Sequence, residues 1–211
     1  MKDKGIRIKN TIKQHIANNL KEYIIVTIIF IIGIFLGVLF INNVGDSEKQ
    51  EITGYLNSFI EKMKNIGSLD YGELLKTSIW QNVLTAIVIW FFGTTVIGIP
   101  IVFGLVLYRG FCLGYTIASC IVTFGTAKGI SFIFTTIFLQ NILLVPAILA
   151  ISVSGFKLYK SIVKEKTKEN IKLEIIRHTV FSFIMLLLMV LSSVIEIFIS
   201  TNLLKNFAKY F

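Results

Sequence analysis

Long apolar stretches, separated by short polar segments, form the hydrophobic pattern of this 211-residue chain. Several of them approach the roughly 20 consecutive apolar residues that a helix needs to cross a bilayer. We expect five spanning helices, at about residues 23–42, 79–97, 101–122, 130–151 and 180–199. The break between the second and the third is placed at Gly98–Pro100, because proline disfavours helical geometry in the residue that precedes it.

The composition supports this interpretation of the pattern. Hydrophobic residues make up 55% of the chain, charged residues only 16%, and the mean hydropathy is +0.77. Globular domains are nearer ~45–50% apolar and ~25% charged, which argues against a soluble enzyme, a nucleic-acid-binding domain or a disordered chain. The sequence therefore predicts an all-α fold, a polytopic integral membrane helical bundle in which residues 1–211 form a single membrane domain.

The basic residues predict the orientation of the bundle. Residues 1–22 and 156–178 hold 13 of the 21 Lys and Arg residues, and basic segments are retained on the cytoplasmic side of a membrane. Five crossings satisfy this rule with the amino terminus inside and the carboxyl terminus outside. The first segment also has an apolar residue at every fourth position, at Ile8, Ile12, Ile16 and Leu20. This spacing is typical of a basic helix that lies on anionic lipid.

Residues 43–77 form the largest segment predicted to lie outside the cell membrane. Their apolar residues recur at three- and four-residue spacing, at Ile52, Tyr55, Leu56, Phe59, Met63 and Ile66. This spacing predicts an amphipathic helix. Its apolar stripe either packs on the outer leaflet or the bundle, or forms a docking ridge for an extracytoplasmic partner. The candidate docking residues are Ile52, Tyr55, Leu56, Phe59 and Met63.

Six residues with amide or charged side chains lie well inside the predicted spans, where such groups are costly and usually face the bundle or a cavity. We call them the intramembrane polar seam, and they are Gln81, Asn82, Arg109, Gln140, Asn141 and Glu196. Arg109 and Glu196 differ in depth by roughly 13 Å at 1.5 Å per residue, so no direct ion pair is expected. Glu196 is predicted to join Gln81 and Asn82 in an outer cluster. Arg109 is predicted to reach the cytoplasmic interface or a mid-membrane amide. These groups either satisfy one another between helices or line a solute path.

Two pairs of glycines are spaced by four residues within the predicted spans, Gly33 with Gly37 and Gly110 with Gly114. This spacing lets helices approach closely. It slightly favours self-association over packing within one bundle, which leaves a homo-oligomer open.

No arrangement of residues predicts an enzyme, a metal site or another cofactor. Ser154 and His178 lie near one predicted membrane edge, but Ser152 stands where an intramembrane serine protease would have a glycine. We interpret Ser154 with Gly155 as a glycine-assisted helix end and His178 as a histidine at the membrane interface. Cys112 and Cys120 lie about 12 Å apart along one helix, too far for a disulfide. Their spacing suits no zinc site either.

Taken in order, these features resemble the stage II sporulation protein M family of spore-forming Firmicutes. The resemblance covers nearly the whole chain. It rests on His15–Leu20 with Gly33 and Gly37, on Phe103–Gly114, on Gln140–Asn141 with Val145–Ala147, and on Ser154–Gly155.

The resemblance implies a role that the residues alone do not. Members of the family sit in the mother-cell membrane at the sporulation septum during engulfment of the forespore. They act with stage II sporulation proteins D and P, two peptidoglycan hydrolases that remodel the septal wall. The chain would then be a non-enzymatic membrane scaffold that anchors and localises these enzymes. The runner-up is a small-solute transporter or channel lined by the intramembrane polar seam.

Overall fold

The computed structural model describes residues 19–65, 71–164, 168–200 and 202–203. The described residues are almost entirely helical and include no strand, which confirms the predicted all-α fold. The elements in chain order are α2 (Leu20–Asn43), α3 (Asp46–Asn65), α4 (Tyr71–Gly93), α5 (Gly98–Phe124), α6 (Thr126–Ile133), the π-helix η1 (Phe134–Phe138), α7 (Leu139–Lys164), α8 (Lys168–Ile195) and the π-helix η2 (Glu196–Ser200).

Five segments in the described part of the chain are long and apolar enough to cross a membrane, as predicted. They are α2, α4, α5, the continuous rod of α6, η1 and α7, and finally α8 with η2. Helices α4 and α8 begin well before the apolar stretches that they contain, because good helix formers such as Leu, Lys and Glu extend them. The predicted basic helix with Ile8, Ile12 and Ile16 lies outside the described residues.

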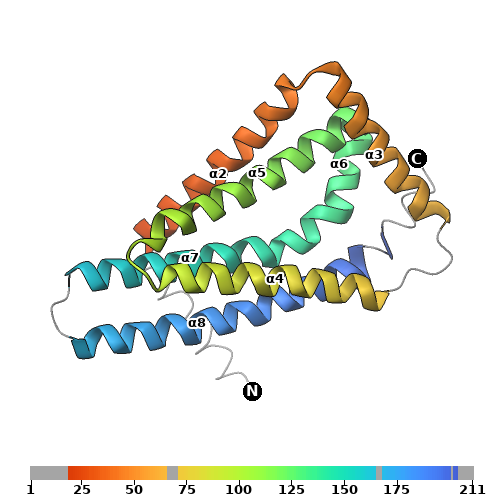
Figure 1. Ribbon diagram of the computed structural model, residues 1–211. Helices are drawn as coiled ribbons and strands as arrows, with labels where there is room; N and C mark the ends of the chain where they lie inside the picture. The colour runs from red at the N-terminus through yellow and green to blue at the C-terminus, as the bar shows by residue number, and fades with distance from the viewer. Residues whose placement is uncertain (1–18, 66–70, 165–167, 201, 204–211) are drawn as a thin grey trace.

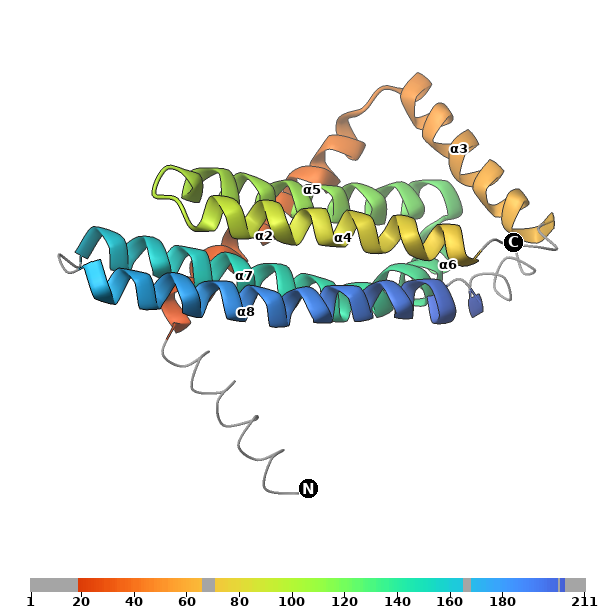
Figure 2. The same ribbon diagram turned by 60° about the horizontal axis from the view of Figure 1, so that its bottom comes forward.

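The spanning helices form two groups, shown in Figure 1. Helices α2 and α5 lie side by side and slant away from α4, α7 and α8, which run together. Helix α6 connects the far end of α5 to the second group. In the turned view of Figure 2, α4 and α5 lie on one side and α7 and α8 on the other. The main apolar core lies between these helices and includes Val26, Val102, Ile148 and Met189.

The start of α2 and the end of α7 meet at one end of the bundle. There Lys160 Nζ and Glu22 Oε1 form an ion pair 2.8 Å apart. The α4–α5 turn and the beginning of α8 lie at the same end, and α3 lies at the opposite one (Figure 1). The predicted topology requires successive connections between spans to lie at alternate ends of the bundle, as they do here. Which end faces the cytoplasm stays a prediction from the positive charges, with the amino terminus in and the carboxyl terminus out.

The turn between α4 and α5 comes a few residues earlier than predicted. Helix α4 ends at Gly93 and α5 begins at Gly98, so Pro100 lies in the first turn of α5. A proline costs little there, because the amide hydrogens of a first turn have no partner within the helix. Thr94 Oγ1 donates a hydrogen bond to the carbonyl oxygen of Phe91 at 2.6 Å and so helps to end α4.

Residues 156–178, predicted as a basic cytoplasmic loop, are largely helical. Helix α7 continues through Ser154–Gly155 to Lys164, and α8 begins at Lys168, so the predicted helix end at Ser154–Gly155 is wrong. Lys, Glu and Arg are good helix formers. In addition, Arg177 Nη1 donates to Glu174 Oε1, one helical turn earlier, at 2.6 Å. Most basic residues of this segment therefore lie in the last turns of α7 and the first turns of α8.

Helices α2 and α5 pack backbone against backbone at the two glycine pairs. A Cβ added to Gly33 or Gly37 would collide with backbone atoms of α5, and one added to Gly110 or Gly114 with backbone atoms of α2. Small residues permit this approach between membrane helices. Both glycine pairs are thus used for packing within one chain rather than for the expected self-association.

Replacing Gly114 by alanine should destabilise the bundle. The added methyl group would collide with the backbone of Ile34 in α2, and overpacking of this kind costs ~1–3 kcal/mol. Gly104→Ala is the matched control, because nothing lies within 4 Å of a Cβ added to this other glycine of α5. In detergent, we expect Gly114→Ala to unfold several degrees below the wild type and Gly104→Ala to match it. Equal unfolding temperatures for the two variants would contradict this packing.

Candidate functional site

A polar cluster around Glu196 joins α4, α7 and η2 inside the apolar bundle. Ser78 Oγ of α4 and Gln140 Nε2 of α7 donate to the same atom, Glu196 Oε2, at 2.5 and 2.7 Å. A carboxyl group in a spanning segment is costly unless hydrogen bonds replace its lost water, and these two donors do so. Ser192 Oγ of α8 donates to the Gln140 carbonyl oxygen at 3.2 Å and ties a further helix to the cluster.

Asn82 is the second centre of this polar cluster. Its side chain is buried, and its Nδ2 donates to Ser193 Oγ at 2.8 Å and to the Met189 carbonyl oxygen at 3.4 Å. Its Oδ1 accepts a hydrogen bond from Arg109 Nη2 at 3.5 Å. One amide therefore links α4 to both α5 and α8.

The structure brings together only part of the intramembrane polar seam. Arg109 reaches an amide, but it is that of Asn82, which was predicted to belong to the outer cluster with Glu196. The predicted separation of Arg109 from that cluster is therefore wrong. The predicted grouping of Glu196 with Gln81 needs correction, because Gln81 is exposed. Ser78 and Asn82 lie one helical turn apart and share a face of α4, whereas Gln81 is rotated by about 100° from Asn82.

Sequence reasoning missed the serines that complete the cluster, Ser78, Ser192 and Ser193. A signal for two of them was present. Ser192 and Ser193 stand four and three residues before Glu196, and such spacing puts residues on one face of a helix. The identity of their partners depends on how the helices are rotated, which the spacing does not give.

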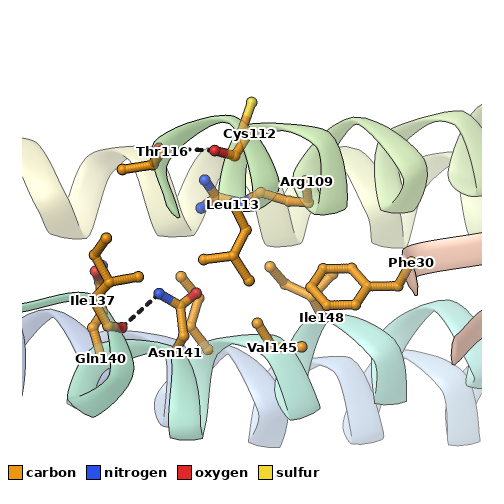
Figure 3. A pocket seen from close by; sticks show the side chains of 11 residues that line it. Phe30, Arg109, Cys112, Leu113, Thr116, Ile137, Gln140, Asn141, Val145 and Ile148 are labelled. Carbon is orange, nitrogen blue, oxygen red and sulfur yellow. Dashed lines mark hydrogen bonds between the residues drawn. The ribbon is translucent and has the colours of Figure 1, made fainter. Parts of the chain in front are cut away.

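A half-enclosed cavity of about 200 Å³ lies beside this cluster, between α5 and the start of α7 (Figure 3). Arg109 lies along α5 on one side of the cavity, and Gln140 and Asn141 lie on the opposite wall. Asn141 Nδ2 donates to the carbonyl oxygen of Ile137 in η1 at 2.8 Å. Phe30 of α2 closes one end of the cavity. π-Helical turns such as η1 are frequent at functional sites.

Helix α3 confirms the predicted amphipathic helix and packs on the end of the bundle that carries α6. Its Ile60 is 4% exposed and lies in an apolar cluster with Cys120 of α5 and Phe132 of α6. Cys112 and Cys120 are both free thiols, as expected. Packing on the bundle thus accounts for part of the apolar stripe of α3.

The candidate docking residues differ in exposure. Ile52, Leu56 and Phe59 are half-buried. Tyr55 is 74% exposed, more than Ile52, Leu56 or Phe59. The side chain of Met63 lies outside the described residues.

A groove of about 540 Å³ runs between α3 and the ends of α2 and α5. Its aromatic lining comes from Phe40, Tyr55 and Tyr115, and the carboxylates of Glu48 and Glu51 lie along it. The Ser47 hydroxyl donates to Glu48 Oε2 at 2.8 Å, and this hydrogen bond lowers the pKa of Glu48. Glu48 is therefore anionic at neutral pH. The groove is apolar inside and negatively charged at its edge.

His178 lies inside the bundle rather than at the interface, which corrects the expectation from the sequence. It is 2% exposed, and its Nδ1 is 2.9 Å from Ser154 Oγ, while its Nε2 is 3.4 Å from the Trp90 carbonyl oxygen. Because a carbonyl oxygen only accepts, Nε2 carries the hydrogen and Ser154 donates to Nδ1. Close approach of Gly93 to Gly155 brings α4 to α7 here. With both side chains buried, the pair has little room for a substrate.

These features define a polytopic α-helical membrane protein with five spans, an amphipathic helix at one end and a polar cluster between its helices. The family model described as Stage II sporulation protein M matches residues 26–201. The chain belongs to the stage II sporulation protein M family and is a sporulation-related membrane protein, in agreement with the resemblance. No curated protein and no solved structure matches it.

Replacing Gln140 by leucine should destabilise the polar cluster. The change removes one of the donors to Glu196, and an under-satisfied buried acceptor costs about 1–3 kcal/mol. Gln81→Leu makes the same chemical change at an exposed position of α4. In detergent, we expect a lower thermal unfolding temperature for Gln140→Leu and little change for Gln81→Leu. A Gln140→Leu protein as stable as Gln81→Leu would show that the cluster does not stabilise the fold.

Proposed function

We propose that this protein is a non-enzymatic scaffold of the engulfment machinery. It is positioned in the mother-cell membrane at the sporulation septum, where it anchors and localises peptidoglycan hydrolases. The hydrolases are stage II sporulation proteins D and P, the partners implied by the family resemblance. Family membership supports a sporulation role, and the geometry of α3 suggests how a membrane bundle could hold extracytoplasmic enzymes.

The observation that carries the proposal is the free side of α3. The helix uses Ile60 to attach itself to the bundle, which leaves Tyr55 exposed beside the groove. Exposed aromatic residues next to an apolar groove are typical anchors of protein interfaces. Under the predicted orientation, this surface faces the septal wall.

The charge of the groove indicates the chemistry of the partner segment. Glu48 and Glu51 are exposed and lie along an otherwise largely apolar groove. Complementary potentials steer partners and select among them. We therefore expect the hydrolases to contribute a segment with an apolar side chain flanked by Lys or Arg.

The contacts favour the scaffold over the transporter. Asn82, Gln140 and Glu196 hydrogen-bond to neighbouring helices, and Gln81 is exposed. These residues therefore act mainly as connections between helices. One half-enclosed cavity is lined by Arg109, Gln140 and Asn141, but Gln81, Asn82 and Glu196 are not part of its lining, so the six residues do not form one continuous path.

Replacing Tyr55 by alanine should weaken capture of proteins D and P by this protein. Truncation of an interface anchor costs about 2 kcal/mol or more, which corresponds to at least roughly 30-fold in affinity. Tyr108→Ala is the matched control, because Tyr108 is 63% exposed but lies on α5, away from the groove. Recovery of proteins D and P from crosslinked sporulating membranes is measured at equal abundance of each variant.

Comparison of the two variants shows whether the partners bind at α3 or elsewhere on the surface. We expect recovery to fall with Tyr55→Ala and to be unchanged with Tyr108→Ala. Equal recovery with both variants and the wild type would contradict a docking surface on α3.

A further inference from the structure

Arg109 is an ionised side chain inside a spanning helix. Helix α5 begins at Gly98, so Arg109 lies eleven residues, or about 16 Å, into it. Arginine stays charged in proteins, and a charge at such depth requires polar or anionic partners.

The protein itself supplies few of these partners. Among the described residues, the guanidinium of Arg109 forms one hydrogen bond, the long one to Asn82 Oδ1 at 3.5 Å. A guanidinium has five N–H donors, so most of them are left for the adjoining cavity. The carboxyl group of Glu196 accepts hydrogen bonds from Ser78 and Gln140 and attracts Arg109 through a longer-range Coulomb interaction, which leaves the guanidinium N–H groups without a hydrogen bond to this carboxylate.

The lining of the cavity indicates what it can hold. None of the eleven side chains that line it is acidic, and Arg109 is the one charged residue among them. Most of the others are apolar, including Leu113 and Val145 on facing helices. The volume of about 200 Å³ exceeds that of an engineered apolar cavity of roughly 150 Å³ that admits benzene. The site therefore suits an anionic group joined to an apolar one.

We infer that this cavity binds an anionic amphiphile. Its oxyanion head accepts hydrogen bonds from the Arg109 guanidinium, whose planar fork matches a carboxylate or a phosphate. Its hydrocarbon tail lies between α5 and α7 and continues into the bilayer, because the cavity is only half-enclosed. A fatty acid and an anionic phospholipid share this chemistry. The inference is independent of the scaffold proposal.

Cys112 gives a readout at the site itself. It lines the cavity and is half-exposed, whereas Cys120 is fully buried and lies outside the cavity. The full-length protein in a neutral detergent is treated with N-ethylmaleimide, and mass spectrometry follows modification of each cysteine. The ligands are palmitate, phosphatidylglycerol, phosphatidylcholine and inorganic phosphate. The first two distinguish the sources of the amphiphile, the third has no net charge, and the fourth has no tail.

We expect palmitate or phosphatidylglycerol to slow modification of Cys112 by at least about fivefold, an effect within reach of one charge-assisted hydrogen-bond pair. Phosphatidylcholine and inorganic phosphate should have no effect. Arg109→Gln should abolish the protection, and Arg109→Lys should retain part of it because the charge remains. The control Gln81→Leu, at an exposed position of α4, should be protected like the wild type.

Three results would overturn the inference. The first is wild-type Cys112 that is modified equally fast with and without both anionic amphiphiles. The second is equal protection by phosphatidylcholine or by inorganic phosphate alone. The third is full protection of a folded Arg109→Gln protein. Because Cys120 is buried in the folded protein, its modification identifies a variant that has unfolded. If Arg109→Gln unfolds, the inference is tested by the protection that the four ligands give to Cys112 in the wild type and in Arg109→Lys.

Discussion

Polar side chains inside a membrane-spanning bundle need hydrogen-bond partners in place of water, and this requirement determines how the central helices sit against one another. Glu196 receives hydrogen bonds from α4 and α7, and Asn82 connects α4 to α5 and α8. Sliding or rotating any one of these helices would expose a carboxyl group or an amide to hydrocarbon. The polar cluster therefore fixes a register that apolar packing leaves loosely defined.

Helix α5 joins this cluster to the rest of the fold. Its Gly110 and Gly114 contact the backbone of α2, and the neighbouring Arg109 reaches the opposite side, toward α4. The same helix then supports α3 through the apolar cluster around Cys120 and Ile60. A bundle held together in this way gives α3 a firm base, which is compatible with the proposed anchoring role. The Arg109 cavity lies between α5 and the start of α7, which belong to different helix groups.

The sequence allowed the number of spans and the amphipathic helix to be anticipated, because each depends on the length or period of one segment. The glycine spacing indicated close helix packing but not that α2 and α5 of one chain are the partners. The family was found from the order of its motifs. The partners within the bundle were harder to predict. The depth of a residue in the membrane follows from its position along a helix. The rotation of that helix and the identity of its neighbours do not, and for this reason Gln81 was assigned to the outer cluster although it is exposed. The burial of His178 likewise depends on how closely Gly93 approaches Gly155, which the sequence does not show.

The proposed function requires that α3 faces outward while the basic ends of α7 and α8 face the cytoplasm. This orientation can be tested with two variants, Tyr55→Cys and Lys160→Cys, each made in a protein that lacks Cys112 and Cys120. Each variant is treated with a membrane-impermeant maleimide in sporulating cells whose wall has been removed and whose membrane is intact. We expect Tyr55→Cys to be labelled in intact cells and Lys160→Cys to be labelled only after the membrane is opened. Labelling of Lys160→Cys in intact cells, with Tyr55→Cys protected, would contradict this orientation.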